Sequence, residues 1–278
     1  MTIRRRERTR YVFTFGRARS GKSTLLASVT QHIASNRDVA LIRNPLRPDG
    51  YTIVNRDWLG AIRAKEFPPE SVSGELVEVD IGIKLLAAPK RRSRRLLQRS
   101  IDFFREPMNS YSSTTALTLF EMAGEDLQQV EVSGHRHAKD ARFPEFVRDA
   151  LMVSHVVLIV VERNRVGPKE DNLIMNFIDF MMPVLGEGGR VEPIPVALVV
   201  SKFDQEAGGK VGALEEFLFE HMPDTMSTLM DRDRFVNVAV LPFSVGDVNV
   251  DTSPHSIKRF DDRYAKSVVG WIYANCDV

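Results

Sequence analysis

The stretch Gly16-Arg17-Ala18-Arg19-Ser20-Gly21-Lys22-Ser23-Thr24 decides the fold of this chain, because it fits the pattern G-x-x-x-x-G-K-[ST]. It follows an apolar, strand-like run over residues 10–15 and opens into a helix-like run over residues 23–34. In this context glycines let backbone N–H groups turn toward phosphate oxygens, and the helix N-terminus adds positive charge. We expect Lys22 to reach the outer phosphates and the Ser23 hydroxyl to bind Mg²⁺. The stretch therefore predicts that the chain binds a nucleoside triphosphate.

Length and composition agree with a globular protein of one large domain or two small ones. The chain has 278 residues, 43% of them hydrophobic, and a single cysteine, Cys276. One cysteine excludes an internal disulfide and is typical of a reducing compartment. The N-terminus is charged and lacks the apolar segment of a signal peptide. No apolar run approaches the roughly 20 residues that span a bilayer. We therefore expect a cytoplasmic protein.

The positive charge of the chain is concentrated in two short segments. Residues 1–10 carry +4 and residues 90–99 carry +6, so the rest carries −9 against an overall +1. A nucleic-acid binder usually spreads basic residues over a folded face, so nucleic acid is an unlikely partner. The 90–99 segment has leucines beside its basic residues. It is compatible with a solvated face, with an anionic membrane or with an acidic protein.

The pattern of apolar residues predicts strands that alternate with helices. Residues 156–161 and 195–200 are continuously apolar, as in central parallel strands covered on both faces. Residues 77–85 alternate with period two, which predicts a strand with one face in water. Further strands are expected at 115–122 and, as the last one, at 236–241. Helices are expected at 57–66, within 90–105, at 172–185, within 210–222 and at 257–274, with irregular segments at 36–74 and 125–149.

These elements predict an α/β fold with a doubly wound, mostly parallel sheet and helices on both faces. Residues 1–9 are expected to form a disordered basic arm. Residues 10–278 are expected to form a single domain, with an inserted basic helix at about 89–113. We find no internal repeat or linker that would divide the chain.

Three further stretches fall where predicted strands end, and this edge binds ligands in open α/β sheets. In Glu121-Met122-Ala123-Gly124-Glu125, the first carboxylate can hold a water on Mg²⁺ and the Gly124 N–H can meet a γ-phosphate. In Ser201-Lys202-Phe203-Asp204, the lysine stem can lie along a purine face. Asp204 can accept two hydrogen bonds from guanine, a pairing that adenine cannot make. Ser244-Val245-Gly246 can offer a backbone N–H to guanine O6.

With these four ordered signatures, the chain resembles the Ras-like P-loop GTPases of the translation-factor-related (TRAFAC) class from about residue 10 to residue 276. Through Phe67-Pro68-Pro69, the A-G-E form and S-K-F-D, it is also similar to bacterial double-GTPase-type proteins. The resemblance implies a Ras-like G domain that uses GTP/GDP and Mg²⁺ as a switch and hydrolyses GTP slowly. The implied nucleotide-binding residues are Gly16, Arg19, Ser20, Gly21, Lys22, Ser23, Thr24, Gly124, Lys202, Asp204, Ser244 and Val245. The implied catalytic residues are Lys22 and Glu125, and the implied metal ligands are Ser23, Glu121 and Ser71.

The chain departs from the family pattern at several of these positions. Glu121 replaces the usual Asp, Glu125 stands where a water-positioning Gln is common, and Ser201 replaces Asn or Thr. The threonine that precedes the second strand in the family has no clear counterpart. Ser71 and Ser73 are the best placed substitutes, and Thr52 is a weaker one.

The departures leave rival functions open. A P-loop ATPase or kinase would prefer ATP, and the S-K-F-D element argues against it. A pseudo-GTPase would bind nucleotide only structurally, and Glu121 and Glu125 keep that alternative open. Arg17 and Arg19 either point to solvent or act on the γ-phosphate. A guanine nucleotide and a protein effector or activator are the expected partners.

Overall fold

The computed structural model describes the phosphate-loop unit and most of the chain from residue 145 onward. The described ranges are residues 9–35, 39–40, 53–54, 58–68, 76–84, 114–122, 145–187, 193–203, 211–249, 251 and 255–276. The predicted basic helix and insertion at 89–113 lie outside these ranges.

The strand–loop–helix unit predicted from the phosphate-loop motif is present. β1 (Thr9–Phe15) leads into the loop, and α1 (Lys22–Ser35) follows it. The Leu25 N–H donates to Gly21 O at 2.8 Å, so the first helical turn begins directly at the loop. Thr9 belongs to the sheet and not to the predicted basic arm at 1–9, whose remaining residues lie outside the described ranges.

β1 lies inside one twisted sheet with the strand order β2-β4-β5-β1-β6-β7-β8, and β3 pairs with β4. The pairs β1/β5, β1/β6, β6/β7 and β7/β8 are parallel, whereas β4/β5 and β2/β4 are antiparallel. The chain adds strands first on one side of β1 and then on the other, which makes the sheet doubly wound. This order confirms the predicted fold class of a P-loop α/β protein. The strands are β2 Val39–Ala40, β3 Ile53–Val54, β4 Leu76–Lys84, β5 Thr114–Met122, β6 Val156–Glu162, β7 Ile194–Ser201 and β8 Phe235–Pro242.

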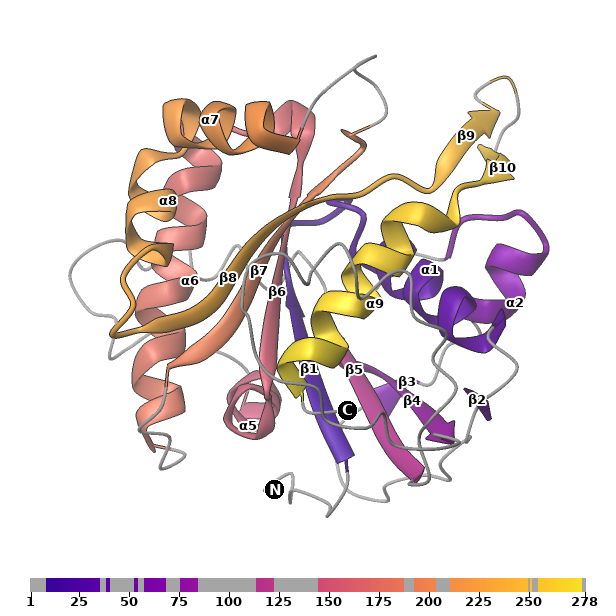
Figure 1. Cartoon of the computed structure of the whole chain (residues 1–278), viewed down its shortest axis with the longest axis horizontal. Coiled ribbons are helices and arrows are strands. Elements are labelled where there is room, and N and C mark those ends of the chain that lie inside the picture. The colour runs from indigo at the N-terminus through magenta and orange to yellow at the C-terminus, as the bar shows by residue number, and fades with distance from the viewer. Residues whose placement is uncertain are drawn as a thin grey trace, which may run out of the picture.

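Helices cover both faces of the sheet (Figure 1). One face carries α1 and α9, and α2 packs beside α1. The other face carries α5, α6, α7 and α8. The helices are α2 Trp58–Arg63, α5 Glu145–Val153, α6 Pro168–Glu187, α7 Val211–His221, α8 Pro223–Leu229 and α9 Asp262–Cys276, with a 3₁₀ turn at Arg163–Arg165.

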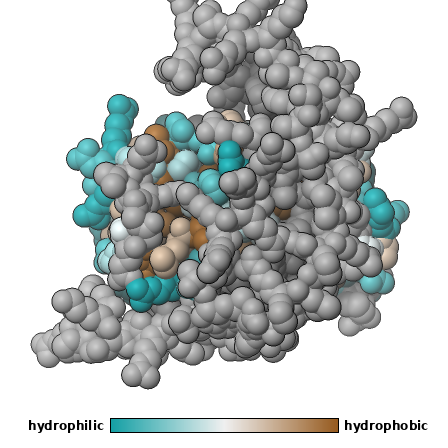
Figure 2. All heavy atoms as spheres, turned by 90° about the horizontal axis from the view of Figure 1, so that it is seen from below, coloured by the Kyte–Doolittle hydropathy of each residue, from teal (hydrophilic) through white to brown (hydrophobic). Residues whose placement is uncertain are grey.

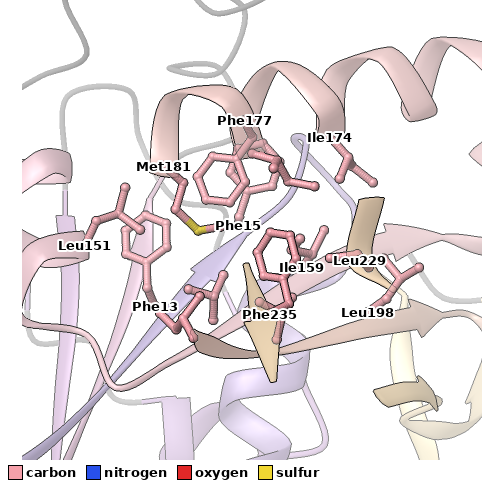
Figure 3. Packing of buried hydrophobic residues seen from close by; sticks show 14 of the residues in the cluster. Phe13, Phe15, Leu151, Ile159, Ile174, Phe177, Met181, Leu198, Leu229 and Phe235 are labelled. Carbon is pink, nitrogen blue, oxygen red and sulfur yellow. The ribbon is translucent and has the colours of Figure 1, made fainter. Parts of the chain in front are cut away.

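Alternation along the central strands divides the interior into two hydrophobic cores. Phe13 and Phe15 of β1 point into the core under α5 and α6, whereas Val12 points into the core under α1 and α9. The Phe15 ring stacks on Phe177 of α6, with ring centroids 3.6 Å apart (Figure 3). Every residue of β6 is buried. A strand covered on both faces has no polar side, which explains its continuous apolar run.

The C-terminal part differs from its sequence-based prediction. Residues 236–241 do lie in a strand, β8, but two more strands follow it: β9 (Gly246–Asn249) and β10 (Ser256–Phe260) form an antiparallel hairpin. The terminal helix therefore starts at Asp262 and not at residue 257. Ile257 is buried in the core under α9. Its apolar side chain therefore matched the spacing expected for the buried face of a helix. Its backbone, however, pairs with Val248.

Three helices on the other face also differ from the prediction. α5 begins at Glu145, inside the segment expected to be irregular, and buries Val147, Ala150 and Leu151. α6 starts at Pro168, four residues before the predicted start. Proline is well suited to a first helical turn, because that turn lacks an internal partner for the missing N–H. α8 is a short extra helix that the apolar spacing did not reveal.

The hydropathy of the described residues was considered for the surface and for the helices. Seen from below, the described residues are hydrophilic at the periphery, and hydrophobic atoms gather nearer the middle (Figure 2). None of the helices in the described part of the chain is long and apolar enough to span a bilayer.

Candidate functional site

The candidate site lies where the parallel strands end. The phosphate loop follows β1, Glu162 ends β6, and Ser201 ends β7. Glu121 is the last residue but one of β5. Carboxyl ends of parallel strands meet at one edge of the sheet, and β1, β5, β6 and β7 are neighbours there. The sequence stretches singled out above are thus brought together by the strand order.

Two glycines of the phosphate loop are required by its close packing. Gly16 has φ +154°, and a Cβ built on it would lie 2.4 Å from Val160 O of β6. Gly21 has φ +91°, and its Cβ would lie 3.3 Å from the Ser201 side chain. Arg19 adopts φ 64° although it is not glycine, and its side chain is exposed. The loop is therefore held tightly against β6 and β7, with a conformation that few other residues allow.

The Lys22 side chain folds back over the loop that precedes it. Its Nζ donates to Gly16 O at 2.7 Å and to Arg17 O at 2.9 Å, and the residue is 4% exposed. Burial lowers the pKa of Lys22, while the nearby carboxylates of Glu121 and Glu170 act in the opposite direction. The Lys22 ammonium is thus held by two carbonyl oxygens. An anion bound at the loop would stabilise its positive charge.

Ser23 and Glu121, two of the metal ligands expected from the sequence, are in direct contact. The Ser23 hydroxyl donates to Glu121 Oε1 at 2.7 Å across the gap between α1 and β5, and Glu121 is 1% exposed. Hydroxyl and carboxylate oxygens are the hard ligands that Mg²⁺ prefers. In the described ranges no group of three or more His, Cys, Asp or Glu could hold a metal. Mg²⁺ at this pair would therefore need further ligands, such as phosphate oxygens and water, to complete its coordination.

The residues that follow β7 are tied to the phosphate loop. The Ser201 hydroxyl donates to Ser20 O at 2.6 Å in a buried contact. Lys202 adopts φ 57°, and the next N–H, that of Phe203, donates to Phe243 O at 3.1 Å. We call residues 201–203 the base-side loop. Ser201 thus links the end of β7 to the phosphate loop by a buried hydrogen bond.

The ammonium group of Lys202 is bound by a carboxylate that the sequence analysis did not single out. Its Nζ forms a 2.7 Å hydrogen bond and ion pair with Glu162 Oε1 at the end of β6. Arg165 forms an ion pair with the other carboxylate oxygen at 3.0 Å, and its Nη1 donates to Ala18 O at 2.9 Å. Glu162 and Arg165 were not among the candidate site residues of the sequence analysis. We examined the ends of the strands that became β5 and β7 for polar residues. The same examination of the end of β6 identifies Glu162.

The turn after β8 is fixed by its own side chain and by the hairpin. Ser244 Oγ accepts a hydrogen bond from the Gly246 N–H at 2.9 Å, and Val245 O accepts one from the Asp261 N–H at 3.0 Å. Gly246 has φ +103°, and a Cβ there would lie 2.2 Å from Arg259 O. Hence the S-V-G signature is a turn held by residues up to sixteen positions later, as in the bond from the Asp261 N–H to Val245 O.

Arg17 does not simply point to solvent. Its Nη1 lies 3.6 Å from Glu170 Oε2, and the Arg17 side chain is 31% exposed while that of Glu170 is 2% exposed. Glu170 stands in the first turn of α6, where a carboxylate is favoured by the helix dipole. A buried acid therefore holds Arg17 beside the phosphate loop.

Two solved structures that the chain resembles are remote likenesses. No family model and no curated protein matches this chain. The chain is similar to the signal recognition particle receptor SRb-GTP/SRX complex of Chaetomium thermophilum at 14% identity and a TM-score of 0.45, covering 86% of this chain and 92% of that one. It is also similar to Methanosarcina barkeri Roco2 RocCORdC bound to GDP at 9% identity and a TM-score of 0.40, covering 94% of this chain and 47% of that one. Both scores are low, so we base the fold on the strand order and the site on its own contacts.

The structure describes most, but not all, of the predicted site. It brings the phosphate loop, Glu121 and Lys202 to one edge of the sheet. Thr24 is half-buried in the first turn of α1. Ser244 and Val245 are both buried in the turn after β8. Gly124, Glu125, Ser71 and Asp204 lie outside the described ranges, and their roles stay predictions.

Proposed function

We propose that this chain binds GTP or GDP together with Mg²⁺ and works as a nucleotide-controlled switch. The observation that carries the proposal is the phosphate loop itself. Lys22 is buried against two loop carbonyls, and the neighbouring Ser23 is hydrogen-bonded to the buried Glu121. Three charged or polar groups at the end of a doubly wound sheet suit a triphosphate and its metal.

The preference for guanine is inferred from the base-side loop. This loop, residues 201–203, is anchored to the phosphate loop by the bond from Ser201 to Ser20 O, and Asp204 is the next residue in the sequence. A site built for hydrogen bonds rejects a base that lacks them by up to about 10⁴–10⁵-fold. We infer that Asp204 pairs with guanine and that the Lys202 stem forms one wall of the base pocket.

Each described residue has a distinct task in this proposal. Lys22 neutralises charge on the outer phosphates, and Ser23 and Glu121 hold the metal, Ser23 directly and Glu121 through a water. Mg²⁺ would supply neutralisation of the charge that develops during phosphoryl transfer. Gly124 would sense the γ-phosphate through its N–H, and Ser71 would add a ligand from the segment before β4.

We propose that hydrolysis is slow without a partner. Glu125 replaces the water-orienting Gln, and a carboxylate beside a triphosphate repels its charge unless it is protonated or turned away. Arg17 forms an ion pair with Glu170, and this ion pair would compete with a contact from Arg17 to the transferring group. We expect intrinsic turnover on the order of 10⁻³ per second or below, raised by a protein activator.

The wider cellular role follows from the same hypothesis. A switch needs an effector or activator protein, and the basic segment 90–99 is a candidate contact for an acidic protein or an anionic membrane. We propose a cytoplasmic location on the basis of the single cysteine.

The decisive experiment is to denature the purified protein and identify the nucleotide that it releases. Calorimetry should then show GTP bound at least about 100-fold more tightly than ATP. Equal affinities would support the ATPase or kinase alternative instead. A single-turnover assay with GTP separates a slow GTPase from a pseudo-GTPase, and unaided turnover of several per second would show the hydrolysis argument to be wrong.

A further inference from the structure

A chain of charges joins the base-side loop to the phosphate loop. It runs from Lys202 Nζ to Glu162 Oε1 at 2.7 Å, and from Glu162 Oε2 to Arg165 Nε at 3.0 Å. It ends where Arg165 Nη1 donates to Ala18 O at 2.9 Å. Its three side chains come from the end of β6, the 3₁₀ turn after it and the loop after β7. None of them is a neighbour of Ala18 in the sequence.

Glu162 is the centre of this chain. Its side chain is 10% exposed, whereas those of Lys202 and Arg165 are about 40% exposed (40% and 38%). A buried carboxylate is costly unless cations compensate it, and here each oxygen faces a different one. In the sheet register Glu162 lies directly opposite Ser201, so the strand pairing sets its distance from Lys202. The acid is therefore rigid, and the two exposed cations are arranged around it.

We propose that Glu162 is a positioning residue that extends the Lys202 side chain along the base pocket. Arg165 forms an ion pair with the same carboxylate and also donates to Ala18 O in the phosphate loop. The inference rests on the proposed function, because it assumes that the Lys202 stem meets the base. A lysine that is already held loses little freedom when the base arrives, whereas a free lysine loses the freedom of its whole stem. Glu162 thus acts on nucleoside binding through Lys202.

This proposal separates the base from the phosphates. The main contacts of the phosphate loop, made by Lys22 and by the bond from Ser201 to Ser20 O, do not involve Glu162. Loss of the Glu162 charge should therefore weaken binding of a nucleotide and spare binding of phosphates alone. A general loosening of the site would weaken both.

The test is a double-variant cycle in the full chain, with Mg²⁺ present. Dissociation constants of GDP and of inorganic triphosphate are measured by calorimetry for wild type, Glu162→Gln, Lys202→Met and the double variant. We expect Glu162→Gln to weaken GDP by about 3- to 10-fold and inorganic triphosphate by less than about twofold. Added to Lys202→Met, it should cost nothing further, because Glu162 acts through that lysine.

A matched control and a second variant guard against a folding artefact. Asp231→Asn breaks another Arg–carboxylate pair with the same three-residue spacing, Asp231 with Arg234, just before β8 begins. It should change neither dissociation constant. Glu162→Asp keeps the charge on a shorter arm and should show a smaller loss for GDP, with thermal unfolding close to that of wild type.

Each outcome decides something. If the losses of the two single variants add in the double variant, or if inorganic triphosphate weakens as much as GDP, the positioning role is wrong while nucleotide binding stands. If wild type prefers ATP, the guanine part of the proposed function fails, and the same cycle with ADP decides the role of Glu162. If wild type binds no nucleotide, both proposals fall.

Discussion

Lys22 is the residue at which burial and charge oppose each other most clearly. Burial lowers its pKa below the ordinary 10.5, and the carboxylates of Glu121 and Glu170 only partly offset that effect. A lysine pKa that is lower in the folded protein makes the free energy of unfolding rise with pH between the lowered pKa and 10.5. Phosphate groups beside Lys22 would favour its protonated form and reverse the shift.

Nucleotide binding should therefore take up protons at alkaline pH. We expect no uptake well below the lowered pKa of Lys22, and growing uptake as pH approaches it from below. Calorimetry in two buffers with different ionisation heats measures the number of protons. Lys169→Ala removes an exposed lysine of α6 and should leave the uptake unchanged. Binding without proton uptake at any alkaline pH would show that phosphates do not meet Lys22.

Ser23 should control the metal dependence of binding. Ser23→Ala removes the hydroxyl that donates to Glu121, and should lower nucleotide affinity in Mg²⁺ by about 10- to 100-fold, the scale for disturbing a metal-site partner. In EDTA the variant and wild type should bind alike. Ser28→Ala is the control, because Ser28 is a buried serine of the same helix whose hydroxyl has no hydrogen-bond partner among the described residues. An equal loss with and without Mg²⁺ would exclude the metal role.

At the scale of elements, the β9–β10 hairpin fixes the turn that carries Ser244 and Val245. The hairpin also reaches the end of α2. The Ile257 N–H donates to Lys65 O at 2.8 Å, and Glu66 forms an isolated bridge with Ser256. The end of α2 is thereby linked through β10 to the turn after β8, although Lys65 and Ile257 are 192 positions apart in the chain.

Gly246→Ala should disrupt this hairpin. A Cβ would lie 2.2 Å from Arg259 O, a backbone atom, and φ +103° is strained for any L side chain. We expect a loss of about 1–3 kcal/mol in the free energy of unfolding, measured by denaturant melts. Gly186→Ala is the control in α6, where a Cβ meets nothing within 4 Å. It should leave stability unchanged or raise it by up to about 1 kcal/mol. Equal stabilities of the two variants would contradict the packing argument.

At the scale of the whole molecule, ligand binding should stabilise both halves of the sheet together. The site draws on β1, β5, β6 and β7, so unfolding of any of these strands removes it. GTP at 100 times its dissociation constant should add about 2.7 kcal/mol to the free energy of unfolding. Thermal melts with GTP, with ATP at the same concentration and with Lys22→Ala test this. A shift that survives in Lys22→Ala would place the nucleotide elsewhere.

The sequence by itself determined the central unit of the fold. The phosphate-loop motif needs a strand before it and a helix after it, and both are present at β1 and α1. Continuous apolar runs identified β6 and β7 as doubly covered strands, because their surroundings leave no polar face. Local signals of this kind depend on neighbours in the chain, and therefore they can be read without the structure. The roles of Gly124, Glu125, Ser71 and Asp204 still rest on the sequence alone.

Only the tertiary structure decided which distant side chains meet. Lys202 forms an ion pair with Glu162, which also binds Arg165, and Arg165 donates to Ala18 O. Arg17 forms an ion pair with Glu170. Ile257 fitted a helical pattern but became part of a strand because Val248 was available to pair with it. The spacing of apolar residues indicates which side chains are buried. It does not indicate which strand pairs with a segment or which charged group a side chain contacts. Those contacts depend on strand order and register, which bring together residues that the sequence keeps apart.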